Sequence, residues 1–429
     1  MFACVIRRLP ALSLTVSLLL SCSGPSRVVL GDERLDVYLP LLEGQRVAIL
    51  SNRSGIVGDK VYNWCLNGGE EVTPESVGVP FGQGSDPSKP VAYGPHLLDV
   101  LIDNGVDVRV IFSPEHGFRG IADAGEKVDS GVDEKTGVPI FSLYGRGGDA
   151  LVPEEDMNSF DVLLVDLQDV GLRYYTYYVT MQKMMDLCAA YGRKVIVLDR
   201  PNPNGFYVDG PVLDMRFKSG IGSLPICMVH GMTMGELALM MNGEGWLEGG
   251  VKCELTVVPC EHYSHGMHCT LVVPPSPNLK DMRSIYLYSS TCFFEGTVVT
   301  AGRGTEFPFE VYGHPDMTDR GFSFVPESIT GAKNPRYLGQ VCRGVDLRSK
   351  PLDEIWAEQV NLDYLLDAYR NTPVDGSFFL PNNHFEKQIG VAYARDMILS
   401  GASASDIKSR WTSDVTSFTA IRSRYLLYP

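Results

Sequence analysis

The chain has 429 residues, 44% of them apolar, which is enough to fill more than one hydrophobic core, so we expect about two domains. Its formal net charge of -15 argues against a nucleic-acid partner, because binding of a phosphate backbone needs a basic surface. No GxGxxG or GxxxxGK[ST] motif follows a candidate strand, which disfavours a nucleotide, and we expect no cofactor.

The first 22 residues resemble a bacterial lipoprotein signal. Arg7 and Arg8 precede an apolar run over 11–20 that is too short to span a bilayer, and LLSC (19–22) resembles a lipobox, whose cysteine is acylated. Cleavage before Cys22 would remove two arginines and no acids, giving a net charge of -17. We therefore expect an exported protein that lipid on Cys22 attaches to a membrane on its periplasmic or cell-surface side. An ordinary signal peptide with a chance cysteine is the alternative.

Apolar runs and helical patterns alternate over residues 46–250. Short β-branched runs that each end in a polar loop lie at 46–52, 106–117, 161–171 and 194–205. Helical spacing follows at 93–105, 175–192 and 233–245, the last opening with Thr233 and Glu236 in capping-box spacing. This order predicts an α/β domain with a Rossmann-like, mostly parallel sheet and helices on both faces.

Polar side chains follow each of the four predicted strands. In open α/β sheets ligands bind beyond the carboxyl ends of the strands, so we expect these clusters to converge there, although polar strand-to-helix loops are also common without any function. The clusters are Asn52, Arg53 and Ser54; Glu115 and His116; Asp166, Gln168, Asp169 and Arg173; and Asp199, Arg200, Asn202 and Asn204.

The pattern changes after about residue 250. Candidate strands lie at 251–260 and 268–278, and helices are predicted at about 352–370, 384–400 and 404–424. We therefore predict a smaller α+β domain over residues 251–429. His262, His265 and His268 have HxxHxxH spacing, but in a predicted loop a solvated polar segment is favoured over a metal site.

Eight cysteines remain once Cys4 and Cys22 are set aside. They form no CxxC pair and are too sparse for the disulfide framework of a small secreted domain, so we expect buried free thiols.

Ordered motifs from about Arg46 to Pro429 closely resemble the NamZ-like exo-β-N-acetylmuramidases, a glycoside hydrolase family formerly described as a domain of unknown function. They include FSPEHGFRG, DLQDVGLRYYTY, VLDRPNPNG, HGMTMGELA, PPSPN, EGTVVTAGRGTEFPFE and RSRYLLYP. The resemblance implies a Rossmann-like domain, a smaller auxiliary domain and a cleft between them. It also implies removal of N-acetylmuramic acid from the non-reducing ends of peptidoglycan fragments, with the SPEHG glutamate, Glu115, as the catalytic acid.

A glycosidase needs a proton donor and a second group that stabilises or attacks the oxocarbenium-like centre. A glutamate that serves as the acid must sit where its charge is poorly solvated or beside another carboxylate. His116 could orient Glu115 or contact the sugar. Asp169 is our preferred second group; the other candidates are Glu295, Glu306, a nucleophilic Tyr175 or Tyr177, and the acetamido group of the substrate.

The muramic sugar carries a lactyl carboxylate, which an acidic protein would repel unless cations lie close by. A guanidinium can bind a carboxylate through two parallel hydrogen bonds, so Arg173, Arg200 and Arg303 are candidate ligands. The tyrosines at 174, 175, 177 and 178 suit sugar faces, and at least two of them are expected to be plain core. Further candidate contacts are Asn52, Asn202, His230 and Glu306.

A lipoprotein that binds cell-wall glycans without cleaving them would use the same cleft, tyrosines and arginines. The two hypotheses differ at Glu115, because a binding protein needs no poised acid.

Overall fold

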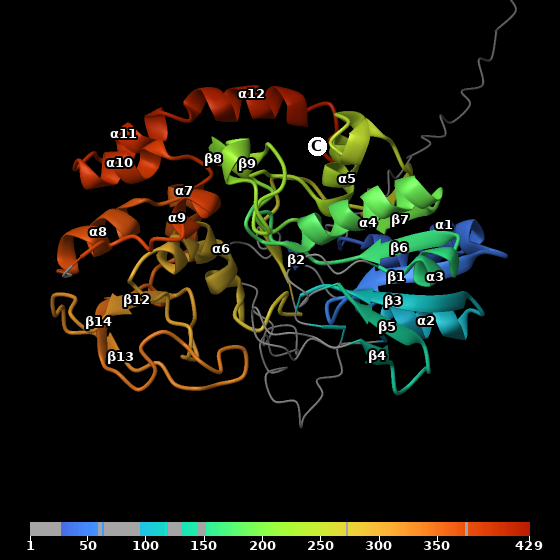
Figure 1. Cartoon of the computed structure of the whole chain (residues 1–429), viewed down its shortest axis with the longest axis horizontal. Helices are drawn as coiled ribbons and strands as arrows, with labels where there is room; N and C mark the ends of the chain where they lie inside the picture. Colours follow the sequence, from blue (N-terminus) through green and yellow to red (C-terminus); the bar gives the residue numbers. More distant parts are fainter. Residues whose placement is uncertain are drawn as a thin grey trace, which may run out of the picture.

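The computed structural model describes residues 27–58, 62–63, 95–115, 117–118, 130–143, 152–271, 273–373 and 376–429, with the backbone alone at 62–63. The described chain forms two lobes, a sheet with helices on both faces and a second lobe richer in helices (Figure 1). The predicted signal over residues 1–22, with Cys22, lies outside the described residues.

The first lobe is built on a seven-stranded sheet of order β10-β7-β6-β1-β3-β5-β4, in which every neighbouring pair is parallel except β4 with β5. All four predicted strands are in it. The strands are β1 (Arg46–Ser51), β3 (Asp107–Ser113), β4 (Gly131–Val132), β5 (Pro139–Ser142), β6 (Val162–Asp166), β7 (Lys194–Leu198) and β10 (Glu254–Val258).

Alternate residues of the central strands enter two separate cores, as a sheet covered on both faces requires. In β1, Ala48 and Leu50 pack on one face, and Val47 and Ile49 on the other. The helices on the first face are α3 (Glu154–Asn158), α4 (Tyr177–Tyr191) and α5 (Met234–Gly243); those on the second are α1 (Leu35–Leu42) and α2 (Leu97–Asp103). The predicted Rossmann-like α/β class is confirmed.

The division that we predicted at residue 250 is too early. Strand β10 pairs in parallel with β7 from Glu254 to Val258 and so completes the edge of the first sheet. The change of pattern after about residue 250 suggested a new domain, but the strand predicted at 251–260 pairs with β7 and so belongs to the first sheet.

The second lobe combines a small antiparallel sheet with helices, in agreement with the predicted α+β class. Each of the three long helices that we predicted is interrupted and forms two shorter ones, for example at Gly390, which has φ 94°. The sheet has the order β12-β14-β13. The strands and helices of the second lobe are β12 (Val311–His314), β13 (Ser323–Phe324), β14 (Cys342–Asp346), α6 (Met282–Thr291), α7 (Leu352–Glu358), α8 (Asp363–Asn371), α9 (His384–Ile389), α10 (Tyr393–Leu399) and α11 (Ala404–Ser409).

The last helix, α12 (Thr412–Arg422), returns to the first lobe. It packs over the hairpin of β8 (Asp209–Val212) and β9 (Cys227–Val229), where Trp411 Nε1 donates to Asp209 Oδ1 at 2.9 Å (Figure 1). A further short pair joins β2 (Tyr62–Asn63) to β11 (Cys269–Thr270).

The segment after α12 is anchored to residues that follow β7 and β10 and to helix α5. The Tyr428 hydroxyl donates to Asp199 Oδ2 at 2.6 Å and accepts from the Cys260 amide at 2.9 Å, and the Leu427 amide donates to Glu236 Oε1 at 2.8 Å. Asp199 and Glu236 are fully buried, so the C-terminal segment completes the polar interior of the first lobe.

Seven of the eight remaining cysteines are buried free thiols, as predicted, and Cys65 lies outside the described residues. In the part of the chain that the structure describes, no helix has the length and apolar character needed to cross a bilayer.

The anchoring of Tyr428 predicts a measurable contribution to stability. Tyr428→Phe removes two buried hydrogen bonds and leaves the Cys260 amide without its acceptor, so the free energy of unfolding should fall by about 1–3 kcal/mol in urea titrations. The matched control is Tyr425→Phe, which removes a half-exposed hydroxyl bonded to Glu244 and should cost less than about 1 kcal/mol. Equal losses in the two variants would contradict the anchoring role.

Candidate active site

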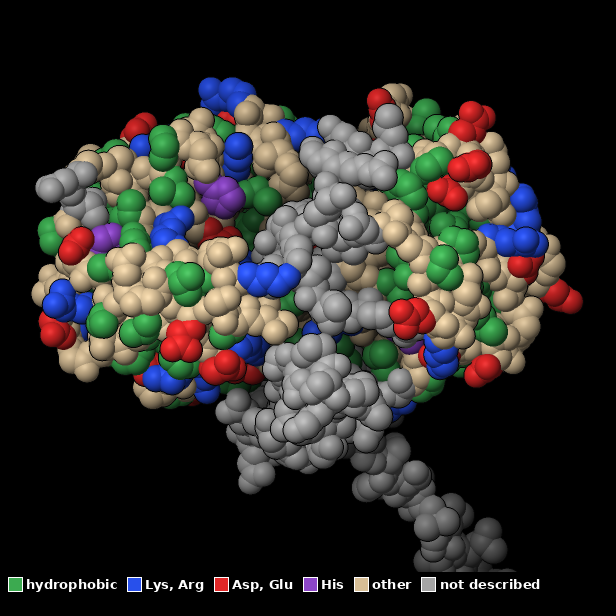
Figure 2. All heavy atoms as spheres, turned by 60° about the horizontal axis from the view of Figure 1, so that its bottom comes forward, with side chains coloured by type: hydrophobic (Ala, Val, Ile, Leu, Met, Phe, Trp, Pro, Cys, Tyr) green, Lys and Arg blue, Asp and Glu red, His purple; other side chains and the backbone are tan. Residues whose placement is uncertain are grey.

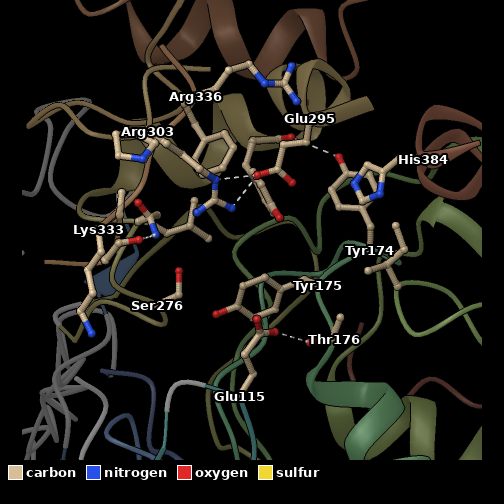
Figure 3. Close-up of a pocket in the computed structure, with 18 of the residues that line it drawn as sticks. Glu115, Tyr174, Tyr175, Thr176, Ser276, Glu295, Arg303, Lys333, Arg336 and His384 are labelled. Carbon is tan, nitrogen blue, oxygen red and sulfur yellow. Dashed lines mark hydrogen bonds and ion pairs between the residues drawn. The ribbon is translucent and has the colours of Figure 1, made fainter. Parts of the chain in front are cut away.

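A cavity of about 730 Å³ lies between the two lobes, at the carboxyl edge of the parallel sheet. Figure 3 shows Glu115, Tyr175 and Thr176 on one side of it and Glu295, Arg303 and Arg336 on the other. The lining residues from the first lobe are Glu115, Tyr174, Tyr175, Thr176, Tyr177 and Ile221; those from the later segments include Ser276, Asn278, Tyr288, Glu295, Arg303, Phe309, Lys333, Arg336 and His384.

Glu115 reaches the cavity from the loop that follows β3. Its side chain is half-buried, and Oε2 accepts a hydrogen bond from Thr176 Oγ1 at 3.1 Å. Thr176 is the N-cap residue of α4, yet its hydroxyl bonds Glu115 instead of capping the helix. The start of α4 therefore orients the carboxyl group. His116 lies outside the described residues.

Three tyrosines of RYYTYY line the cavity and the fourth is core. Tyr174 donates to the Tyr288 and Ser289 carbonyls at 3.1 and 3.0 Å, and Tyr175 packs edge-on against Tyr177 with ring centroids 4.9 Å apart. Tyr178 is fully buried. Helix α4 begins only at Tyr177, so the helical rule that residues four apart share a face does not apply to Tyr174 and Tyr178.

Burial raises the pKa of the Tyr175 and Tyr177 hydroxyls above their usual value. A tyrosine nucleophile needs an accessible phenolate, so these two residues suit contact with a sugar better than attack on it.

The second lobe contributes an ion pair. Glu295 Oε1 lies 2.6 Å from Arg303 Nε, and both side chains are 26% exposed. The AGRG turn that carries Arg303 needs its glycines: Gly302 and Gly304 have φ of 77° and 86°, and a Cβ on Gly304 would lie 2.8 Å from the Glu327 carbonyl. Burial alone would lower the pKa of Arg303, but Glu295 and Tyr288 raise it above its usual value, so the arginine is charged.

The 331–336 loop and His384, for which we predicted no role, complete this wall. Arg336 Nη1 donates to the carbonyls of Thr297 and Val299, and burial lowers the pKa of His384. Two cations in the Gly-, Asn- and Pro-containing segment GAKNPR were the available signal. Ser276 and Asn278 belong to the PPSPN motif, to which we also gave no role.

The remaining strand-end clusters converge as expected, but their side chains bond to one another and are not among the residues that line the cavity. Arg200 Nε donates to Asp166 Oδ1 at 2.6 Å and Nη2 to Asp32 Oδ2 at 2.7 Å, and its side chain is 1% exposed. Asn52 Oδ1 accepts from the amide and the hydroxyl of Ser54. These groups form a buried polar layer, so the geometry does not support Arg200 or Asn52 as direct ligands.

Arg173, Asn202 and His230 are also interior. Arg173 donates from Nη1 to the Pro211 and Ile226 carbonyls and from Nη2 to those of Gln388 and Ile389, so it joins the two lobes. Asn202 Nδ2 donates to the Met232 carbonyl at 2.9 Å, and His230 Nδ1 accepts from the Met232 amide. All three side chains are buried, which explains why backbone bonding replaces the ligand contacts that we predicted.

Of the acids considered as the second catalytic group, Glu295 lines the cavity, whereas Asp169 and Glu306 are not among the described lining residues. Asp169 Oδ1 accepts from the Gly171 amide at 2.7 Å, and burial raises the pKa of its carboxyl to about 7. The Glu306 side chain is 79% exposed and pairs with Lys280 at 3.0 Å.

The HxxHxxH histidines occupy different surroundings. His265 Nε2 lies 2.9 Å from Glu236 Oε1, and His268 stacks on Trp356 with ring centroids 3.9 Å apart. His262 is exposed with φ 61°. Among the described residues, the three imidazoles therefore do not form a cluster that could hold a metal ion.

The cavity combines the groups that glycoside chemistry uses. A carboxyl group held by a hydroxyl, aromatic rings with polar edges, and a charged arginine surround one space large enough for a sugar. This arrangement is suited to binding an amino sugar that carries a carboxylate.

Similarity to known proteins agrees with that chemistry. A family model described as exo-β-N-acetylmuramidase NamZ, N-terminal, matches residues 86–283, and its C-terminal counterpart matches residues 286–428. The peptidoglycan β-N-acetylmuramidase NamZ of Bacillus subtilis (strain 168) is 35% identical over 350 residues, which are 77% of this chain and 82% of that protein.

Two crystal structures of DUF1343 family proteins from Bacteroides fragilis share the fold. The first is 48% identical with a TM-score of 0.80, and the second is 24% identical with a TM-score of 0.67. Each comparison covers 94% of this chain and 99% of the other. From the two family models and the Bacillus relative, the chain belongs to the exo-β-N-acetylmuramidase NamZ family of hydrolases.

Proposed function

We propose that this protein is an exo-acting glycoside hydrolase that releases N-acetylmuramic acid from the non-reducing ends of peptidoglycan fragments, with Glu115 as the general acid. The observation that carries the proposal is the position of Glu115: its carboxyl group is fixed by Thr176 at a cavity between the lobes, opposite Arg303. Membership of an enzyme family favours this function over glycan binding without cleavage.

In the proposed reaction, Glu115 gives its proton to the glycosidic oxygen as the bond to the anomeric carbon breaks, and that oxygen keeps the bonding electron pair. The anomeric carbon finally receives the oxygen of a water molecule, and the proton released from this water restores the acid. The tyrosines contact the sugar face, and they exclude water from one side of the ring.

The substrate's lactyl carboxylate needs a local cation. On the face that Figure 2 shows, acidic and basic side chains of the described residues are mixed over both lobes. The described residues on that face therefore form no broad basic surface that could attract the carboxylate. Of the three arginines that we predicted as ligands, Arg303 lines the cavity, and we assign the carboxylate to it.

Glu115→Gln should lower kcat by about 10²–10⁴-fold, because glutamine cannot donate the proton. The loss should be larger for a muramyl disaccharide than for a nitrophenyl muramide, whose leaving group needs less acid assistance. Steady-state kinetics on both substrates measure this, while calorimetry with N-acetylmuramic acid should show binding retained. Glu306→Gln, at an exposed acid outside the cavity, is the control. Unchanged turnover of Glu115→Gln would refute the proposed acid and favour a binding protein.

Asp169→Asn should change the pH dependence of stability more than turnover. The native carboxyl keeps its proton to about pH 7, whereas the unfolded chain releases it near pH 4, so the native state loses stability as the pH rises through this interval. Between pH 5 and pH 8, removing this group should reduce that loss by about 2–3 kcal/mol. Some dependence should remain, since burial also raises the pKa of Asp199 to about 6.

Urea unfolding at pH 5 and pH 8 gives the stability difference for Asp169→Asn. We expect its kcat to stay within about threefold of the parent, in keeping with a position outside the cavity lining. A thousand-fold loss of kcat in a stably folded variant would instead make Asp169 the second catalytic group.

We also propose that the protein is exported and attached to a membrane by lipid on Cys22, from the LLSC motif. Cys22→Ala should abolish incorporation of a labelled fatty acid in a bacterial host and shift the protein from the membrane to the soluble fraction. Cys4→Ala, within the segment that cleavage removes, should change neither. Labelling that persists in Cys22→Ala would exclude this anchor.

A further inference from the structure

Arg303 is held from two directions on the cavity wall. Glu295 Oε1 lies 2.6 Å from both Nε and Nη2 of Arg303, and the guanidinium lies over the Phe309 ring at 5.0 Å from its centroid. A side-on ion pair and an aromatic face together restrict the rotation of a side chain that is otherwise long and flexible.

The opposite edge of the guanidinium faces the cavity. Within the described part of the chain, no residue hydrogen-bonds Arg303 Nη1. Glu295 Oε1 accepts from Nε and from one hydrogen of Nη2. Nη1 and the second hydrogen on Nη2 can therefore donate to a ligand. A planar carboxylate can accept from two such parallel N–H groups.

Glu295 itself is poorly placed for attack on a sugar. Oε1 is bound by Arg303, and Oε2 lies 3.7 Å from the Cys292 thiol, so both oxygens have protein partners. A nucleophile or general base needs an oxygen directed at the anomeric carbon or at a water beside it. The contacts instead fit a residue that acts on Arg303.

The neighbouring side chains limit the cost of adding a second negative charge. Arg336 lines the same wall, with Nη1 bonded to two backbone carbonyls, and Lys333 lies at the edge of the cavity (Figure 3). A bound carboxylate would therefore share this wall with the cation of Arg336 as well as that of Arg303, and the positive charge of Arg336 reduces the repulsion from Glu295.

We propose that Glu295 is a positioning residue that fixes Arg303 as a selective receptor for the carboxylate of an acidic amino sugar, so that the pair sets the preference for N-acetylmuramic acid over N-acetylglucosamine. This inference rests on the proposed function, because it assumes that the cavity is the glycosidase site. It assigns selectivity, and not the chemical step, to Glu295.

The experiment compares Glu295→Gln with the parent enzyme on a nitrophenyl muramide, with N-acetylmuramic acid and N-acetylglucosamine as competitive inhibitors. Glutamine keeps the shape of the side chain but removes the charge that holds Arg303. We expect KM and the inhibition constant of N-acetylmuramic acid to rise about 10- to 100-fold, with kcat within about threefold and the constant for N-acetylglucosamine unchanged. Arg303→Lys, which keeps the charge but loses the planar fork, should show the same selective loss.

Glu306→Gln is again the matched control, because it removes an exposed carboxyl 11 positions from Glu295 that pairs with Lys280. A fall in kcat of a thousand-fold at unchanged KM in Glu295→Gln would overturn the proposal and make Glu295 a catalytic group. Equal weakening of both inhibitors, or of neither, would also overturn it. If Glu295→Gln does not fold, Glu295→Asp replaces it: the shorter side chain keeps the charge but does not reach Arg303 in the same way, so the same selective loss is expected.

The two proposals fail in different ways. An active Glu115→Gln variant would refute the assigned acid whatever the two inhibitors do. An inactive Glu115→Gln variant together with an unselective Glu295→Gln would leave the reaction in place and remove the receptor from it.

Discussion

The buried charge of Arg200 is the constraint on which the carboxyl edge of the sheet depends. A guanidinium that is 1% exposed is tolerated only when it is paired, and Asp166 and Asp32 supply the partners at 2.6 and 2.7 Å. These contacts fix the ends of β6 and β7 relative to the N-terminal segment. The loop from β6 to α4 begins at this fixed point, and it delivers Tyr175 and Thr176 to the cavity and Thr176 to Glu115.

A second buried arginine, Arg173, connects the two lobes. Arg173 donates four described hydrogen bonds to backbone carbonyls, two in the β8–β9 region and two at the end of α9. Burial lowers its pKa to about 10, which still leaves it charged at neutral pH. The relative placement of Glu115 and Arg303 therefore depends on internal charges that never meet a ligand, and polar residues at strand ends are as much structural as functional.

Sequence periodicity was sufficient for the four central strands of the parallel sheet, since they are continuous apolar runs, and for helix α5, which opens with a capping box of Thr233 and Glu236. Periodicity did not reveal that β10 belongs to the first sheet, because that assignment depends on its pairing with β7, a strand distant in the sequence. The site was predicted only in part: Glu115, Tyr175, Tyr177, Arg303 and the alternative acid Glu295 line the cavity. Arg200 and Arg173 looked like ligands because a sequence does not reveal that an arginine is already paired. Lys333, Arg336 and His384 lie in segments without periodicity, and only folding brings them together.

The position of Tyr428 has a consequence for the order in which the molecule is completed. Asp199 and Cys260 obtain a partner from a residue that the ribosome adds long after both of them. The first lobe cannot reach its final set of contacts while it is the only part synthesised, so its maturation waits for nearly the whole polypeptide. In nascent chains that stop within the second lobe, Asp199 and Cys260 would lack their hydrogen bonds with Tyr428, and the first lobe would lack the contacts of the C-terminal segment.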